Sequence, residues 1–256
     1  ELPFSSRLIR NVHKVLLSGV RGEHKQPGEF RKSQNWIGGA SINDAIFVPP
    51  VHTSIPDLMN DIDEFVHNDK LLIPELLKIA LIHYQFETIH PFLDGNGRTG
   101  RLMITLYLVS KGILKRPILY LSDYLEKHRN SYYTNLTQAR TENDITSWFR
   151  FFLTGVIETA DNGVKTFENI LCLQKEYEEK IKSLGSRSAN ALKVVTELYK
   201  RPIASANWIA EIADISTASA YKLIRNLEEV GILSEVTGSK RGRIYILKKY
   251  VDIFNS

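Results

Sequence analysis

The chain has 256 residues and a mass of 29.2 kDa, which is enough for one large domain or two of ordinary size. Apolar residues make up 43% and charged residues 24%, as in soluble globular proteins, which excludes a disordered chain and a collagen-like repeat. No run of eighteen apolar residues occurs, so we expect no membrane partner. The single cysteine, Cys172, cannot form an internal disulfide, which favours a reducing compartment and predicts a cytoplasmic protein.

The net charge of +4 is unevenly distributed along the chain. Residues 1–185 carry 22 basic and 22 acidic side chains, whereas residues 186–256 carry 11 basic and 7 acidic ones. The whole positive excess therefore lies in the last quarter. Such a shift in composition indicates a second domain with a different partner.

The first 160 residues carry helical apolar spacing, interrupted by one stretch rich in Gly, Pro and Asn. Short apolar runs in that stretch predict a small β-hairpin from Ser33 to Pro50. A charged segment, residues 163–184, predicts a helix that connects this part to the next. The other helices expected here span residues 6–20, 55–68, 73–90, 98–111, 122–140 and 145–158.

The remaining residues predict three helices followed by two strands. The first helix covers residues 188–200, Ser205 would cap a short helix from Ala206 to Ala213, and Ser216 would cap a third helix ending near Glu229. Alternating apolar residues predict strands at 232–236 and 243–247, joined by a basic turn. This order is typical of a winged helix-turn-helix. We therefore expect a mainly α protein with an N-terminal domain at 1–160, a connecting helix at 161–185 and a winged helix-turn-helix domain at 186–256.

The segment His90-Pro-Phe-Leu-Asp94-Gly95-Asn96-Gly97-Arg98-Thr99-Gly100-Arg101 concentrates chemically active residues between two predicted helices. Its glycines allow several backbone N–H groups to face one centre, which favours phosphate binding at the start of a helix. Arg98 and Arg101 are three residues apart, so both lie on one side of the first helical turn and suit a polyphosphate. Asp94 is a candidate ligand for Mg²⁺, and His90 is a candidate general base.

Three other interpretations apply to the same segment. Gly95–Gly100 spells GxGxxG, but the dinucleotide-binding fingerprint follows a strand, and the residues before His90 indicate a helix. A metal site from His83, His90 and Asp94 is a second interpretation. A glycine-rich loop that only caps a helix is the third, although it would not require His, Asp and two Arg at these spacings.

The segment HPFLDGNGRTGR resembles the Fic (filamentation induced by cAMP) motif HxFx(D/E)GNGRxxR at every defining position. The resemblance extends over roughly residues 1–160 and implies a helical core with a hairpin flap. It also implies transfer of AMP from ATP to a Ser, Thr or Tyr hydroxyl of a target protein or of the chain itself, with release of pyrophosphate. The Doc branch, which phosphorylates its target, has Lys at the position of Gly97. Adenylylation is therefore the expected reaction.

The resemblance also assigns roles to single residues. His90 would deprotonate the target hydroxyl, Asp94 would hold Mg²⁺, and Phe92 would anchor the loop. An aromatic residue after the motif, Tyr133, is expected to contact adenine, and Trp36 and Ile37 of the flap would dock the target's backbone. The residues expected to bind ATP are Gly95, Asn96, Gly97, Arg98, Thr99, Gly100, Arg101 and Tyr133. No copy of the family's inhibitory helix is visible, and we expect any such helix to precede Glu1.

The basic residues expected to contact nucleic acid through the winged helix are Lys222, Arg225, Lys240, Arg241 and Arg243. Protein docking or a homodimer are the alternative uses of that domain. A different function would be a nucleotide-sensing DNA-binding regulator whose Fic core does not turn over. Within the enzyme class, phosphotransfer and removal of AMP remain alternatives to adenylylation.

Overall fold

The computed structural model describes residues 3–18, 25–239 and 242–254. The chain divides into two compact units, Glu1–Asp161 and Asn162–Ser256, and the division falls inside helix α7, Ile145–Lys182. Most residues are helical, which confirms the expected mainly α class. In the part of the chain that is described, no helix is both long and apolar enough to cross a membrane.

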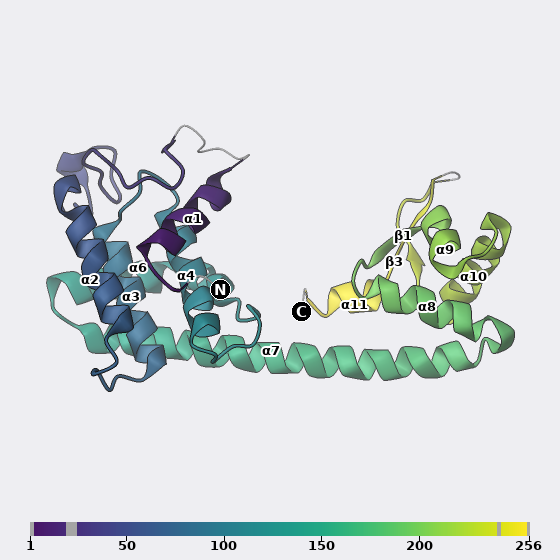
Figure 1. Ribbon diagram of the computed structural model, residues 1–256. Helices are drawn as coiled ribbons and strands as arrows, with labels where there is room; N and C mark the ends of the chain where they lie inside the picture. The colour runs from purple at the N-terminus through teal and green to yellow at the C-terminus, as the bar shows by residue number, and fades with distance from the viewer. Residues whose placement is uncertain (1–2, 19–24, 240–241, 255–256) are drawn as a thin grey trace. The chain divides into compact units, whose positions relative to one another are not determined.

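Helix α3 (Glu75–Ile89) is the centre of the N-terminal unit (Figure 1). It packs against both α2 (Ile55–His67) and α4 (Asn96–Ser110), so residues on nearly all of its sides are buried. The indole of Trp148 in α7 donates a hydrogen bond of 3.0 Å to the carbonyl of Ala80 and closes the core. The other elements of this unit are α1 (Ser6–Leu17), α5 (Leu121–Lys127), α6 (Arg129–Thr141) and the short 3₁₀ turns η2 (Ile42–Asp44) and η3 (His52–Ser54).

Three predictions for this unit are wrong in detail. The hairpin is reduced to one antiparallel bridge, Ile37 with Phe47, because Gly38 and Gly39 adopt positive φ beside it (73° and 72°). The helix expected at 122–140 is divided at His128 into α5 and α6. The segments expected at 145–158 and 163–184 form the single helix α7, since Gly163, at the expected break, costs only about 1 kcal/mol and does not end a long helix.

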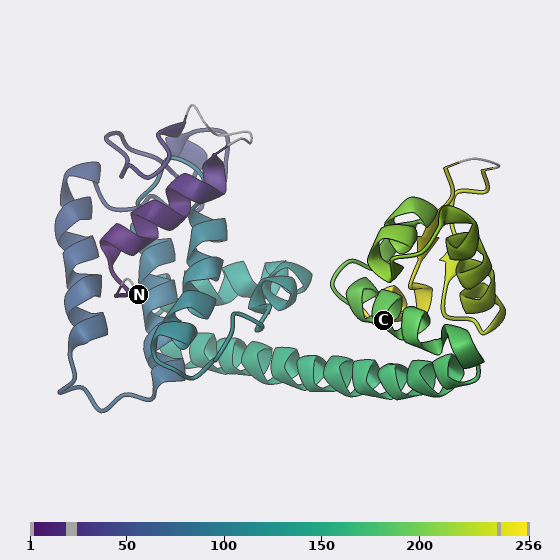
Figure 2. The ribbon, with the colours of Figure 1, turned by 45° about the vertical axis from the view of Figure 1, so that its right-hand side comes forward.

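The C-terminal unit packs helices beside a small antiparallel sheet (Figure 2). Ser205 accepts a hydrogen bond from the Trp208 N–H and Ser216 accepts one from the Ser219 N–H, which confirms both predicted N-caps. The sheet has the order β1-β3-β2. Strand β1 and the final helix were not predicted. The elements are η4 (Gly185–Arg187), α8 (Ser188–Leu198), α9 (Ala206–Ala213), α10 (Thr217–Glu229), α11 (Lys248–Asp252), β1 (Ile203–Ser205), β2 (Ser234–Glu235) and β3 (Ile244–Ile246).

Candidate active site

The loop between α3 and α4 is a tight turn fixed by two left-handed residues. His90 follows α3 with φ 50° and ψ 59°, and Gly95 precedes α4 with φ 79°. For a residue other than Gly, this conformation costs roughly 1–2 kcal/mol, so the surrounding contacts must hold His90 in place.

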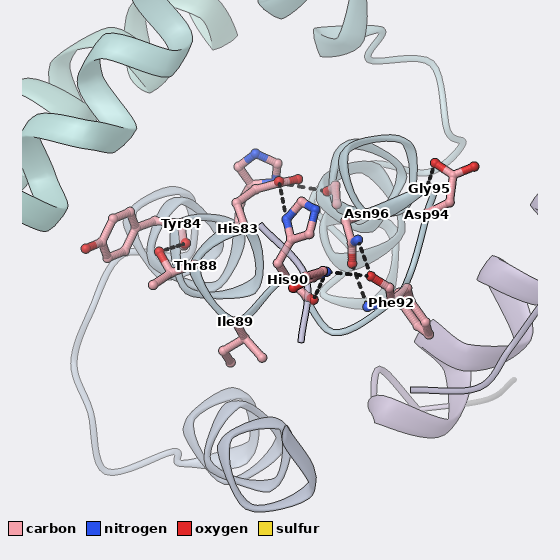
Figure 3. Close-up of polar contacts among 12 residues, drawn as sticks. His83, Tyr84, Thr88, Ile89, His90, Phe92, Asp94, Gly95 and Asn96 are labelled. Atoms are coloured by element: carbon pink, nitrogen blue, oxygen red, sulfur yellow. Dashed lines mark hydrogen bonds and ion pairs between the residues drawn. The ribbon is translucent and has the colours of Figure 1, made fainter. Parts of the chain in front are cut away.

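Asn96 closes the loop on itself. Its side-chain oxygen accepts from the Phe92 N–H at 2.9 Å, and its side-chain nitrogen donates to the Phe92 carbonyl at 2.8 Å (Figure 3). The ring of Phe92 is fully buried, as expected for an anchor. The amide of Asn96 is therefore committed to the loop, and only its backbone N–H remains for a ligand.

His13 of α1 supports the loop from the other side and was not predicted from the sequence. Its Nδ1 accepts from the Gly28 N–H at 2.8 Å, and its Nε2 therefore carries the proton and donates to the Asp94 carbonyl at 2.9 Å. Burial lowers the pKa of His13, which keeps this neutral form. The sequence feature that could have identified His13 is its position among the apolar, inward-facing residues of the first predicted helix.

The start of α4 offers a cluster of unpaired backbone donors. The first helical bond runs from the Thr99 N–H to the Gly95 carbonyl at 2.9 Å, so the N–H groups of Asn96, Gly97 and Arg98 have no acceptor among the described residues. A Cβ at Gly97 would lie 3.2 Å from the guanidinium of Arg101, which shows that this cation lies beside the same turn. Three such N–H groups, the helix dipole and a nearby Arg side chain are features that favour the binding of a phosphate chain.

Asp94 lies at the edge of this cluster with a half-exposed carboxylate. One oxygen accepts from the Gly95 N–H at 2.7 Å, and the other lies 3.7 Å from the guanidinium of Arg98. No group of three or more His, Cys, Asp or Glu side chains with metal-binding geometry occurs among the described residues. A single accessible carboxylate still fits Mg²⁺, which binds through one or two carboxylates together with substrate phosphates and water.

His90 combines burial with an unused ring nitrogen. Its Nδ1 is buried, has no hydrogen-bond partner in the described part of the chain and lies 3.9 Å from a carboxylate oxygen of Glu87 (Figure 3). Burial, the largest effect, lowers the pKa of His90 to about 4. The imidazole is therefore neutral near pH 7 and able to accept a proton.

Glu87 is the second buried titratable group beside His90, and the sequence did not decide its role. Only 5% of its surface is exposed, and burial raises the pKa of its carboxyl to about 7, against the opposing effect of Arg101 and Arg140. One of its oxygens is buried without a hydrogen bond. The carboxyl of Glu87 therefore changes its protonation near pH 7.

His83 is a structural residue. Its Nδ1 donates to the Gly100 carbonyl at 3.0 Å, and its Nε2 accepts from the Tyr132 hydroxyl at 2.9 Å. Both nitrogens are occupied and the ring is fully buried. The interpretation of His83, His90 and Asp94 as a metal site is therefore wrong.

Two residues of the predicted ATP set belong to the core instead. Thr99 is fully buried, with a side-chain oxygen that makes no hydrogen bond. Gly100 packs so closely on α3 that an added Cβ would lie 2.5 Å from a carboxylate oxygen of Glu87. Both lie on the buried side of the first turn of α4, whereas Asn96, Gly97 and Arg98 carry the N–H groups without an acceptor among the described residues. Thr99 and Gly100 support the loop from within.

Trp36 and Ile37 of the flap, and Tyr133, differ in how far they are free to contact a ligand or a target. The Ile37 N–H donates to the Phe47 carbonyl, and the Ile37 carbonyl accepts from Ile46 and Phe47, so the backbone of Ile37 is not free to dock a target. Among the described residues, no hydrogen bond involves the Trp36 backbone, and its side chain is 42% exposed. Tyr133 is 44% exposed, with the Arg129 guanidinium 5.7 Å from its ring centroid.

The predicted nucleic-acid contacts lie in the C-terminal unit. Lys222 and Arg225 are exposed on α10, whose opposite face is buried. The exposed Arg243 donates to the Ser239 carbonyl at 2.9 Å. Lys240 and Arg241 lie outside the described residues.

The N-terminal part of the chain is similar to known proteins. Residues 3–108 match the model of the Fic/DOC family. A protein adenylyltransferase Fic of Aedes aegypti is 32% identical over 154 residues, which cover 60% of this chain and 28% of that protein. A protein of the same name from Culex quinquefasciatus is 30% identical over 154 residues, with the same coverage. The chain thus spans less than a third of the length of these curated relatives.

The fold has a counterpart among solved structures. A Fic family protein from Desulfovibrio desulfuricans G20 has a TM-score of 0.57 and 21% identity, covering 94% of this chain and 68% of that one. This likeness concerns the fold. The loop from His90 to Arg101 lies within residues 3–108, the segment that matches the Fic/DOC family model.

Proposed function

We propose that this protein is a protein adenylyltransferase that transfers AMP from ATP to a hydroxyl side chain of a target protein or of itself. The observation that carries the proposal is the position of a neutral His90 on the same loop as the three unpaired N–H groups at the start of α4. A general base and a polyphosphate site are the two parts that this transfer requires.

In the proposed reaction, Nε2 of His90 takes the proton of the target hydroxyl as its oxygen attacks the α-phosphorus of ATP. A new P–O bond forms, the bond between the α- and β-phosphates breaks, and pyrophosphate leaves. The N–H groups of Asn96, Gly97 and Arg98, together with Arg98 and Arg101, stabilise the negative charge of the phosphates. Mg²⁺ held by Asp94 would neutralise phosphate charge when bound.

Gly97 favours adenylylation over phosphotransfer. Without a side chain, the first turn of α4 is open to the outer phosphates, while the Arg101 guanidinium lies close by. A larger side chain would occupy that space and displace the phosphate chain. With the outer phosphates in this turn, the α-phosphate is the group left to face His90.

The proposed contacts with adenine and with the target involve two exposed aromatic residues. Tyr133, beside the Arg129 cation, offers an aromatic surface for adenine. Trp36 offers unpaired backbone groups for an extended target segment, whereas Ile37 contributes by holding the flap to Phe47.

The proposal is tested with ATP labelled on the α-phosphate and a parallel assay for released pyrophosphate. Wild-type protein and His90→Ala are compared, with His67→Ala as the control, because His67 is exposed at the end of α2 and its one side-chain hydrogen bond among the described residues is to the Phe4 carbonyl. We expect labelled protein and pyrophosphate from the wild type and from His67→Ala, and neither from His90→Ala. Equal transfer by His90→Ala would contradict the role of His90 as the base.

For the C-terminal unit we propose a winged helix-turn-helix that binds duplex DNA. The supporting observation is that Lys222 and Arg225 are exposed on α10 without an acidic partner among the described residues. Binding to a labelled duplex should weaken in Lys222→Gln/Arg225→Gln, with a smaller dependence on salt concentration. The control is Lys193→Gln, an exposed cation of α8. Unchanged binding in the double variant would favour a protein-docking role.

A further inference from the structure

Arg31 is a buried cation without an acidic partner. Its exposure is 2%, and no carboxylate among the described residues forms an ion pair with it. Burial lowers the pKa of its guanidinium. A buried charge is costly unless hydrogen bonds compensate it. The hydrogen bonds that compensate the buried charge of Arg31 therefore show which segments it joins.

Every hydrogen bond from the Arg31 side chain goes to a backbone carbonyl. One terminal nitrogen donates to the Ser33 carbonyl at 3.0 Å, and the other donates to the Pro50 carbonyl at 2.5 Å. Ser33 and Pro50 are the first and last residues of the flap. One planar guanidinium thus closes the base of the flap, a geometry that the fixed fork of Arg allows and Lys does not.

The same guanidinium holds the loop that carries the base. Its Nε donates to the His90 carbonyl at 3.0 Å, and a terminal nitrogen lies 3.4 Å from the Ile89 carbonyl. The backbone N–H of Arg31 donates to the Pro91 carbonyl at 2.8 Å. Three consecutive carbonyls, those of Ile89, His90 and Pro91, therefore accept from one residue, at the place where the chain adopts its left-handed turn.

Asn35, within the flap, adds to these contacts. Its side-chain nitrogen donates to the Phe92 carbonyl at 3.1 Å and lies 3.4 Å from the His90 carbonyl. Its side-chain oxygen is buried without a partner. The flap and the His90 backbone are thus joined by two side chains, and neither side chain has a hydrogen bond to the start of α4.

We propose that Arg31 is a positioning residue that couples the flap to His90, so that one side chain sets both the docking segment and the base for transfer to a hydroxyl. The proposal rests on the proposed adenylyltransferase function. The guanidinium holds His90 in its strained conformation and places the flap at a fixed distance from the imidazole. Loss of Arg31 should therefore impair transfer and leave ATP binding nearly intact, because the donors of α4 do not depend on it.

The test compares Arg31→Ala and Arg31→Lys with Lys32→Gln, an exposed cation at the next position. ATP affinity is measured by calorimetry, and AMP transfer to the chain itself by intact mass over time. We expect both Arg31 variants to lose at least about tenfold in transfer rate, since a displacement of about 1 Å costs on the order of 100-fold. The ATP affinity should change by less than about threefold, a change of under about 1 kcal/mol. Lys32→Gln should match the wild type.

Chemical rescue separates positioning from general damage to the fold. Added guanidinium ion should restore transfer in Arg31→Ala but not in His90→Ala, and ammonium ion should restore neither. Transfer within twofold of wild type in both Arg31 variants would overturn the proposal, as would a parallel loss of ATP affinity and transfer. If Arg31→Ala does not fold, Asn35→Ala serves in its place and should slow transfer at unchanged ATP affinity.

Transfer by the wild-type protein distinguishes failure of the proposed function from failure of the coupling. If the wild type itself transfers no AMP, the proposed function fails while the coupling can still be measured by NMR of the His90 ring. A shifted His90 resonance in Arg31→Lys but not in Lys32→Gln would support the coupling. Unshifted resonances in both variants would overturn it.

Discussion

The ring of Phe92 stacks on the ring of His13, with centroids 3.7 Å apart and planes 4° apart. Phe92 belongs to the motif loop, whereas His13 belongs to the first helix of the chain. The stack and the two hydrogen bonds of His13, to Gly28 and Asp94, join three segments that are distant in sequence. The loop geometry therefore depends on α1 as well as on the motif.

His13→Ala should destabilise the N-terminal unit by about 2–4 kcal/mol, because the change removes the stacked ring and leaves the Gly28 N–H and the Asp94 carbonyl without partners. Asn11→Ala, an exposed change on the same helix, is the control. Thermal unfolding followed by calorimetry measures both variants. A shift no larger than that of Asn11→Ala would show that the loop does not need this support.

Gly100 and Gly163 should respond in opposite ways to the same substitution. Gly100→Ala places a Cβ 2.5 Å from the buried Glu87 carboxylate and should cost about 1–3 kcal/mol and displace Glu87 toward His90. Gly163→Ala meets nothing within 4 Å and should stabilise α7 by about 0.5–1 kcal/mol. Urea unfolding of both variants tests the pair, and a stable Gly100→Ala protein with normal transfer would contradict the packing described.

Replacing Glu87 should make the fold more sensitive to acid. The pKa of Glu87 is raised to about 7, so the folded state binds more protons than the unfolded state between about pH 7 and 4.5, and Glu87 adds stability as the pH falls. His83 and His90, with pKa values lowered to about 4, act in the opposite direction below about pH 6.5.

In Glu87→Gln the opposing effects of the buried histidines remain, including that of His13, whose pKa is also lowered. Relative to wild type, the variant should lose stability more steeply between pH 7 and 4.5, by on the order of 2 kcal/mol. The measurement is the unfolding midpoint of the wild type and of Glu87→Gln across this pH range. Parallel curves for the two proteins would mean that Glu87 titrates at its ordinary pKa.

The pH dependence of transfer should reflect the lowered pKa of His90. Because His90 is neutral above about pH 4, its protonation should not limit the rate between about pH 5.5 and 8. The quantity to measure is kcat/KM for AMP transfer across that range. A fall in kcat/KM as the pH drops through about 6.5 would contradict this and would indicate that His90 has the pKa of an ordinary, solvated imidazole.

The sequence predicts local features of this protein well. The N-caps Ser205 and Ser216 and the bounds of α9 were predicted correctly because they depend on neighbours within a turn. Strand β1 has three residues and forms only by pairing with β3. The flap, held by the Arg31 side chain rather than by a ladder of strand pairs, carried no local pattern from which its geometry could be inferred.

The candidate site likewise combines residues that are neighbours in the sequence with residues that are distant in it. His90, Asp94 and the first residues of α4 are adjacent in sequence, so their spacing predicts that they lie together on one loop, as the structure has them. His13, Arg31 and Asn35 contact the loop from 55 or more residues away. The burial of Thr99 and Gly100 could not be predicted, because a motif gives residue types but not which side of a helix is buried.

The most direct test of the central proposal is the intact mass of the chain after incubation with ATP and Mg²⁺, for the wild type and His90→Ala. We predict that the wild type gains the mass of one AMP, with label from the α-phosphate alone, and that His90→Ala gains nothing. A gain of one phosphate, with label from the γ-phosphate, would contradict adenylylation and indicate a kinase.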